Sequence, residues 1–218
     1  MKTRTLISTL ASLVFCAGLI LPTFAEELKP VQLPAPKLEQ SKPLMQALKE
    51  RQSTREYGSG NLSPQVLSNL LWAAWGINRP DSGKRTAPSA YNRQDIDVYV
   101  ATAQGAYRYD AKANTLVPVA PGDIRTLTGT QSYIKGAAID LVYVGDLAKA
   151  GNEPEVEKMF TEALETGFIG QNVYLYSASE GLATVFRLRI DQPKLAKALK
   201  LRPDQRIIGA QTVGLSKK

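Results

Sequence analysis

A long helical segment at residues 153–182 constrains the fold more than any other feature of this sequence. The segment reads EPEVEKMFTEALETGFIGQNVYLYSASEGL. A mostly apolar stripe recurs in it at helical spacing, through Val156, Phe160, Ala163, Leu164, Gly167, Gln171, Leu175 and Ala178. From residue 168 onward the segment is apolar almost all round, which predicts that this half of the helix is buried on every side.

Strand patterns lie on both sides of this helix in the sequence. Residues 95–119 alternate in polarity and turn at Gln104–Gly105 and again near Asp110–Asn114, which predicts a β-meander. Runs rich in β-branched and apolar residues predict three further strands, at 137–146, 183–190 and 206–215. Because helices and antiparallel strands are interspersed without regular β-α-β units, the predicted fold class is α+β.

Shorter helices are predicted from their capping residues. One spans 41–53, with Ser41 as its cap, and a stronger pattern at 63–78 has Ser63 as cap and Pro64 in the first turn. In this second helix Trp72 and Trp75 fit the apolar stripe and are expected in the core. Two more are predicted at 122–129 and, after the cap Asp191, at 191–200.

The first 25 residues have the pattern of a cleaved export signal. Lys2 and Arg4 precede an apolar stretch, and a small-residue site ends at Ala25. A retained anchor is the alternative, but the apolar run is short for a span of about 20 residues. We therefore expect export, to a bacterial periplasm, with no stable membrane span after cleavage. A proline-containing arm at 26–40 would lie along a partner surface, and 41–218 would form one domain.

The composition excludes several kinds of catalysis. The chain has no histidine, and its one cysteine, Cys16, lies in the predicted leader. Ser-His-Asp and Cys-His mechanisms are therefore excluded, and a zinc site would need carboxylates alone, so no metal site is predicted. Redox or transfer chemistry would have to come mostly from a bound cofactor. The net charge of +7 is interpreted as a solvated basic surface rather than a nucleic-acid site, because no arginine-aromatic run accompanies it.

Two basic, polar stretches stand out between apolar runs, RQSTREYGSG at 51–60 and RTAPSAYNRQ at 85–94. In the first, Arg51 and Arg55 either neutralise the end of the preceding helix or form, with Ser53, an anion clamp suited to phosphate. The second is either a polar loop or a proline-fixed backbone that presents amides. In that case Asn92 would both donate and accept at the edge of a heterocycle. No G-x-G-x-x-G motif supports a Rossmann site.

In this order, the stretches RQSTREY, PSAYNRQ, GFIGQNVYLYSASEGLATVFRLRID and RIIGAQTVGLSKK resemble the nitroreductase-like family of FMN-dependent oxidoreductases. The resemblance covers nearly the whole mature chain. The family's opening pattern, R-x-S-x-R-x-aromatic, is satisfied by Arg51, Ser53, Arg55 and Tyr57. The compact length and RTAPSA look most like the azoline-oxidase-type dehydrogenase branch.

The resemblance implies a nitroreductase-like fold, in which helices flank a central antiparallel-rich sheet. It also implies an intertwined homodimer with the flavin at the subunit interface. An apolar terminal strand left as a free edge would be an aggregation hazard, so the strand at 206–215 is likewise expected to find a partner surface.

The resemblance also implies cofactor contacts. Arg51 and Ser53 would contact the FMN phosphate, and Arg55 would lie near the ribityl chain and pyrimidine edge, where its charge would stabilise reduced flavin. Lys217 would supply the family's last basic phosphate contact. Asn92 would pair with the N3–O2 edge. The isoalloxazine ring would meet backbone groups of two further segments, Pro88, Ser89 and Ala90 in the first and Arg187, Leu188 and Arg189 in the second. Many relatives have a glycine at the position of Leu188 or Arg189.

The implied activity is hydride transfer at flavin N5 between a donor and a small organic substrate or acceptor of nitro, quinone or azoline type. No catalytic acid or base is evident, although Tyr57 and Tyr91 are candidate proton donors. Besides the small molecule and a second copy, the expected partners include an electron-transfer protein. Two alternatives stay open, a flavin-binding or interaction protein without turnover and a basic module for anionic polymers.

Overall fold

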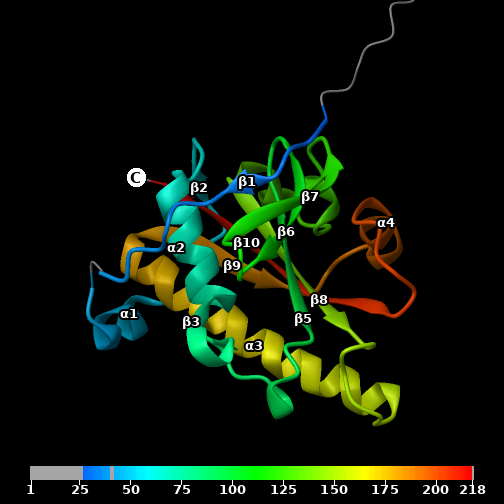
Figure 1. Ribbon diagram of the computed structural model, residues 1–218. Helices are drawn as coiled ribbons and strands as arrows, with labels where there is room; N and C mark the ends of the chain where they lie inside the picture. Colours follow the sequence, from blue (N-terminus) through cyan, green and yellow to red (C-terminus); the bar gives the residue numbers. More distant parts are fainter. Residues whose placement is uncertain (1–26, 40–41, 218) are drawn as a thin grey trace, which may run out of the picture.

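The domain is built on a large antiparallel sheet with helices on both faces (Figure 1). The computed structural model describes residues 27–39 and 42–217. Eight strands of the described chain form the sheet in the order β1-β7-β6-β5-β8-β10-β2, with β9 paired to β10. Their bounds are β1 Val31–Gln32, β2 Tyr57–Gly58, β5 Ile96–Ala101, β6 Gly105–Asp110, β7 Thr115–Pro121, β8 Ile139–Asp146, β9 Leu182–Arg187 and β10 Gln205–Ser216. A separate hairpin joins β3, Ile77–Arg79, to β4, Lys84–Arg85.

The sheet is buried on both faces at its centre. Every residue of β8 is buried, and its neighbours β5 and β10 run antiparallel to it. Successive side chains point to opposite faces, so Leu141 and Tyr143 join one apolar cluster while Val142 and Val144 join the other. The predicted meander is confirmed as β5, β6 and β7.

The part of the chain that the structure describes contains four α-helices, which lie on both sides of the sheet. They are α1 Leu44–Glu50, α2 Pro64–Trp75, α3 Glu155–Glu180 and α4 Gln192–Ala198. α2 and α3 pack on one face through residues such as Leu70 and Ile169, whereas α4 packs on the other through Leu195. The α+β class expected from the sequence, with helices flanking an antiparallel-rich sheet, is therefore confirmed. Short 3-10 turns occur at Pro80–Ser82, Ala90–Asn92, Arg125–Leu127 and Ser132–Gly136.

The helix caps follow the sequence closely. The Ser63 hydroxyl accepts the Val66 N–H at 3.3 Å, and the Asp191 carboxylate accepts the Lys194 N–H at 3.3 Å. Trp75 is buried as predicted, while Trp72 is half-buried and donates its indole N–H to the Ile77 carbonyl.

Two helix predictions need correction. α1 ends at Glu50, so residues 51–53 lie beyond it, and its predicted cap Ser41 falls outside the described residues. The predicted helix at 122–129 is only a 3-10 turn at Arg125–Leu127, because Asp123 caps the Arg125 N–H and no further α-helical bond follows.

The terminal strand and the arm find their partners within the chain itself. β10 pairs with β8 and, at its C-terminal end, with β2 along one edge and with β9 along the other, so the partner surface expected for the terminal strand is supplied within the chain by its own sheet. The arm pairs Val31–Gln32 with β7 and buries Leu33, so this stretch lies on its own sheet, and contact of the arm with a partner stays a prediction. The predicted leader lies outside the described residues. Among the helices that are described, none is long and apolar enough to cross a membrane.

Candidate functional site

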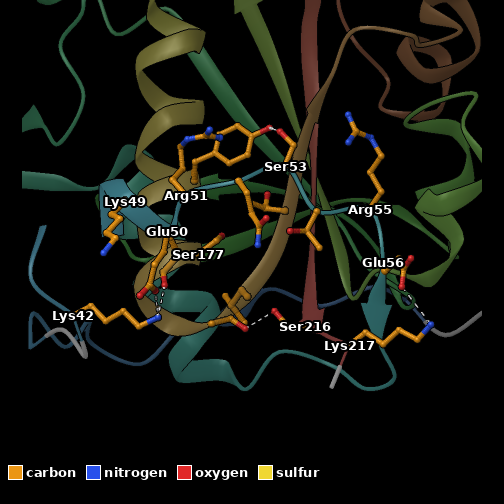
Figure 2. A pocket seen from close by; sticks show the side chains of 17 residues that line it. Lys42, Lys49, Glu50, Arg51, Ser53, Arg55, Glu56, Ser177, Ser216 and Lys217 are labelled. Carbon is orange, nitrogen blue, oxygen red and sulfur yellow. Dashed lines mark hydrogen bonds and ion pairs between the residues drawn. The ribbon is translucent and has the colours of Figure 1, made fainter. Parts of the chain in front are cut away.

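A pocket of about 860 Å³ opens where the segment after α1 runs beside β9. Figure 2 shows that its lining comes from the end of α1, residues 51–56, the C-terminal part of α3 and the end of β10. The pocket brings together four residues predicted from the sequence, namely Arg51, Ser53, Arg55 and Lys217. Pairing of β2 with β10 thus brings residues 51–56 beside the last described residues of the chain.

Backbone hydrogen bonds position the segment that carries the motif. The Arg51 N–H caps α1 by donating to the Ala47 carbonyl at 2.9 Å. Three residues later, the Thr54 N–H donates to the Thr184 carbonyl on the outer edge of β9, also at 2.9 Å. Residues two apart on an extended segment point to the same side. Figure 2 accordingly shows Arg51, Ser53 and Arg55 on one side of this segment.

The pocket carries excess positive charge. Lys42 pairs with Glu50 at 2.6 Å, and Lys217 pairs with Glu56 at 3.3 Å. The remaining three cations, Lys49, Arg51 and Arg55, have no carboxylate partner among the residues that the structure describes. An unneutralised cluster of this kind, with two planar guanidinium forks, suits a multiply charged anion such as phosphate.

A tyrosine that was not predicted from the sequence organises the arginine side of the pocket. The Tyr174 hydroxyl lies 2.9 Å from the Ser53 hydroxyl and accepts the Phe186 N–H at 2.8 Å. The Arg51 guanidinium carbon lies 5.2 Å from the centre of the Tyr174 ring. The signal in the sequence was a tyrosine within the nearly all-apolar half of the long helix, where its hydroxyl would need a partner.

The donor set fits a phosphorylated cofactor. The Ser177 hydroxyl lines the same pocket, is buried, and has no hydrogen-bond partner within the described chain. Buried polar groups are normally satisfied, so an unpaired hydroxyl at a binding pocket favours a ligand group there. Arginine forks, an ammonium and two serine hydroxyls match a phosphate and a polyol chain. No group of three His, Cys, Asp or Glu residues in the described chain is placed to hold a metal ion.

The second predicted set, Pro88, Ser89, Ala90 and Asn92, does not line this pocket. Its loop packs against a part of α3 that precedes the pocket residues in the sequence, where the Ala90 N–H donates to Glu165 at 2.7 Å. Glu165 precedes Tyr174 by nine residues, which is about 14 Å along a helix axis at 1.5 Å per residue. Pro88 and Asn92 are exposed. In one chain, therefore, the two predicted halves of the cofactor site lie apart.

The loop that carries this second set is held in a tight left-handed turn. Tyr91, Asn92 and Gln94 all have positive φ, at 52°, 57° and 51°. Gln94 closes the turn, since its N–H donates to the Ser89 hydroxyl and its side-chain amide donates to Asn92. Tyr91, a candidate proton donor, is 88% exposed. Non-glycine residues seldom adopt this backbone, and such conformations cluster at binding sites.

The third predicted set comes at and after the end of β9. β9 stops at Arg187, so Leu188 and Arg189 lie outside the strand predicted at 183–190. The Arg187 side chain turns into the protein, where it donates to Asp140 at 2.5 Å and to the Thr128 carbonyl at 2.6 Å. Leu188 is 71% exposed. None of the three lines the pocket, although Phe186, the residue before them, is bonded to Tyr174. Their contact with a flavin ring stays a prediction.

Tyr57, the other candidate proton donor, is part of the structural frame. Its hydroxyl donates to the Thr54 carbonyl at 3.2 Å, and burial raises its pKa far above the ordinary range. It therefore stays neutral at physiological pH and braces the segment that carries Ser53 and Arg55.

Comparison with known proteins agrees with this fold and site. The family model described as "Nitroreductase family" matches residues 48–215. A provisionally assigned nitroreductase of Ralstonia eutropha JMP134, whose crystal structure is known, is 39% identical with a TM-score of 0.83. That match covers 87% of this chain and 90% of the other. A provisionally assigned nitroreductase of Methanocaldococcus jannaschii is 28% identical over 165 residues, or 71% of this chain and 82% of that protein.

Two more distant structures share the fold alone. A Desulfovibrio desulfuricans protein solved in complex with FMN has a TM-score of 0.59 at 23% identity, covering 81% of this chain and 88% of the other. A chain of the Escherichia coli microcin synthetase McbBCD complex has a TM-score of 0.67 at 21% identity, covering 96% and 85%.

An α+β fold with a basic pocket suited to a phosphorylated ligand defines the general class of this protein. The family match, which spans most of the chain, and the 39% identical relative make the assignment specific. The chain belongs to the nitroreductase family. Membership of this family implies a flavin-dependent oxidoreductase.

Proposed function

We propose that the protein is an FMN-dependent oxidoreductase acting on a small organic substrate or acceptor of nitro, quinone or azoline type. The observation that carries this proposal is the pocket in which Lys49, Arg51 and Arg55 lack carboxylate partners beside the Ser53 and Ser177 hydroxyls. FMN, when bound, would supply hydride transfer at its N5 atom. The chain supplies binding, orientation and charge.

Within this proposal each pocket residue has a distinct task. Arg51 and Ser53 would hold the phosphate, with Lys49 and Lys217 adding charge. Arg55, which points to the other side of Ser53 from Arg51 in Figure 2, would lie toward the ring and oppose negative charge on it. The backbone of Pro88–Ala90 would pass the ring, the backbone N–H groups of Arg187–Arg189 would point to its N5 and O4 atoms, and the side chain of Asn92 would pair with its N3–O2 edge.

A second copy of the chain would complete the site. The loop at 88–92 lies about 14 Å along α3 from the pocket of its own chain, so it would serve the pocket of the partner. α3 also exposes an unusual apolar stripe, formed by Val156, Met159, Phe160, Leu164 and Phe168. Exposed apolar surface of this extent marks an interface, and a twofold axis would pair the stripe with itself.

We further propose that the protein acts after export, with the leader at 1–25 removed. The pattern of Lys2, Arg4, the apolar stretch and Ala25 supports this. An exported enzyme has no pool of reduced pyridine nucleotides, so its substrate or an electron-transfer partner would deliver the electrons. The azoline-type substrate class rests on the resemblance of RTAPSA and the compact length.

Titration of the flavin-free protein with FMN and with riboflavin tests the cofactor proposal. We expect stoichiometric binding of FMN and binding of riboflavin at least about tenfold weaker, because riboflavin lacks the phosphate and a tenfold change corresponds to 1.4 kcal/mol. Arg108→Ala, which removes an exposed arginine on β6 far from the pocket, serves as the control and should bind like the wild type. Failure to bind FMN, or equal affinity for both flavins, would overturn the assignment of this pocket.

A further inference from the structure

Tyr174 forms the centre of a short hydrogen-bond chain that ends at the pocket. Its hydroxyl accepts the Phe186 N–H at 2.8 Å and lies 2.9 Å from the Ser53 hydroxyl. The chain thus joins three elements, the β9 backbone, α3 and the segment that follows α1. Ser53 is exposed in the pocket, whereas the Phe186 amide lies on the sheet side.

Either hydroxyl could donate in the Tyr174–Ser53 bond, but the Tyr174 proton has no acceptor in the described chain other than Ser53, which favours one direction for this chain. A backbone amide can only donate, so the Tyr174 oxygen must act as the acceptor toward Phe186. A phenol has one proton, and donating it to Ser53 leaves the Ser53 proton free to point into the pocket. Hydrogen bonds aligned in this way polarise one another, which strengthens the last donor.

The Tyr174 ring also fixes the neighbouring cation. The Arg51 guanidinium lies over the ring, with its central carbon 5.2 Å from the ring centre. No hydrogen bond or ion pair within the described chain involves this guanidinium, so the ring face is what orients it there. One side chain therefore presents both the serine hydroxyl and the arginine fork.

We propose that Tyr174 is a positioning residue for the cofactor phosphate. It directs the Ser53 proton and the Arg51 guanidinium toward the phosphate and ties this end of the site to β9. The inference rests on the proposed function, because it assumes that the anion in this pocket is a flavin phosphate. It assigns the residue no direct role in the redox reaction.

The test compares FMN with riboflavin in three variants. Tyr174→Phe keeps the ring beneath Arg51 and removes only the hydroxyl, so we expect the Kd for FMN to rise about tenfold while that for riboflavin changes less than about twofold. Ser53→Ala should give the same selective loss. The double variant should bind FMN no more than about twofold worse than Ser53→Ala alone, because the two groups act through one chain. Tyr176→Phe, which removes a hydroxyl bonded to the Val66 carbonyl two residues further along α3, is the matched control.

Several outcomes would overturn the inference. An equal loss for both flavins would mean that Tyr174 acts only on the general structure, and additive losses would mean that it acts independently of Ser53. If Tyr174→Phe does not fold, Ser53→Ala carries the test, since it keeps the bond between Tyr174 and Phe186. An equal loss of affinity for FMN and riboflavin in Ser53→Ala would overturn the proposed role of the hydrogen-bond chain. If the wild type binds FMN and Tyr174→Phe binds it with the same Kd, this inference alone is wrong. If the wild type binds no FMN, the proposed function is wrong as well.

Discussion

Arg51 and Arg55 belong to one short motif but have different neighbours. Arg51 lies over the Tyr174 ring, on α3, whereas the Arg55 guanidinium carbon lies 6.0 Å from the centre of the Tyr133 ring. Tyr133 belongs to the 3-10 turn that precedes β8. Two side chains four residues apart on one segment are thus directed to opposite ends of the same pocket, which predicts different roles.

Alanine substitutions should separate the two roles. Arg51→Ala should weaken FMN binding much more than riboflavin binding, because it would remove a proposed phosphate contact. Arg55→Ala should weaken both and lower the flavin midpoint potential, because in the proposed site its charge would stabilise the reduced anionic ring. A charge-assisted hydrogen bond contributes roughly 1.5–3 kcal/mol, so each Kd should rise on the order of tenfold to a hundredfold. The measurements are fluorescence titration and equilibrium redox titration. An Arg55→Ala protein with wild-type affinity and potential would remove Arg55 from the site.

Glu165 is a buried carboxyl that contacts the loop at residues 88–92, and its protonation makes the stability of the protein depend on pH. It is 2% exposed, accepts the Ala90 N–H, and lies near Asp95 and Glu162. Burial raises the pKa of Glu165 to about 8, and the neighbouring Asp95 adds to the rise. Burial likewise raises the pKa of Glu162 to about 7. The folded protein therefore holds protons in a range where the unfolded chain has released them.

This difference predicts the sign of a pH effect on stability. The folded pKa lies above the ordinary value of 4.5, so the contribution of Glu165 is fully present below about pH 4.5 and is lost as the pH rises to about 8. Glu165→Gln keeps an oxygen for the Ala90 N–H but does not titrate. Between pH 5 and pH 8 the wild type should lose at least about 1 kcal/mol more unfolding free energy than this variant, since one pKa unit corresponds to 1.36 kcal/mol.

Urea unfolding at the two pH values measures this difference. Glu39→Gln, a change at an exposed glutamate of the arm, is the control and should follow the wild type. Identical pH dependence in the wild type and Glu165→Gln would show that the carboxyl is already ionised in the folded protein.

At the scale of elements, α3 has two faces with different tasks. One face packs on the sheet through Ile169 and Val173, which are fully buried. The other exposes the stripe that includes Phe160 and Leu164, at 66% and 50%. The sequence predicted that the helix is buried all round from residue 168. Phe168 is 47% exposed in the single chain, so that prediction is wrong for this residue.

The stripe predicts the effect of a charge on assembly. Phe160→Glu should convert the proposed homodimer to a monomer, because a buried unpaired charge at an interface is costly. Val31→Glu, which places the same charge on an exposed apolar residue of β1, should leave the dimer intact. Analytical ultracentrifugation measures the difference. A Phe160→Glu protein that stays dimeric would place the interface elsewhere. FMN content should fall with the dimer, because the loop at 88–92 of a partner would complete the site.

For the whole molecule, sequence patterns that reflect local interactions predicted the helix starts more reliably than strand patterns predicted which strands pair. Ser63, Pro64 and Asp191 predicted helix starts, because capping is a local interaction. The position of β10 between β8 and β9 was not predicted, since an apolar strand pattern does not say which strands flank it.

In the candidate site, too, residues close in sequence could be grouped from the sequence, and residues brought together only by folding could not. Arg51, Ser53 and Arg55 lie within one short motif, so a sequence pattern was enough to group them, and the sheet then brings Lys217 beside them. Tyr174 was missed because its role depends on a contact across 121 residues. The separation of Asn92 from the pocket could not be read from one sequence, because spacing along the chain does not determine spatial proximity.

Anaerobic reduction of the FMN-bound protein tests the central claim most directly. The bound flavin, at one per chain, should lose its absorbance when an organic donor is added and regain it in stoichiometric amount when a quinone or nitroaromatic acceptor follows. NADH and NADPH, included as donors, should reduce it slowly, well below a kcat/KM of about 10⁴ M⁻¹s⁻¹, if the protein works after export. A flavin that binds stoichiometrically but is neither reduced by any donor nor reoxidised by any acceptor would contradict the account and leave a flavin-binding protein without turnover.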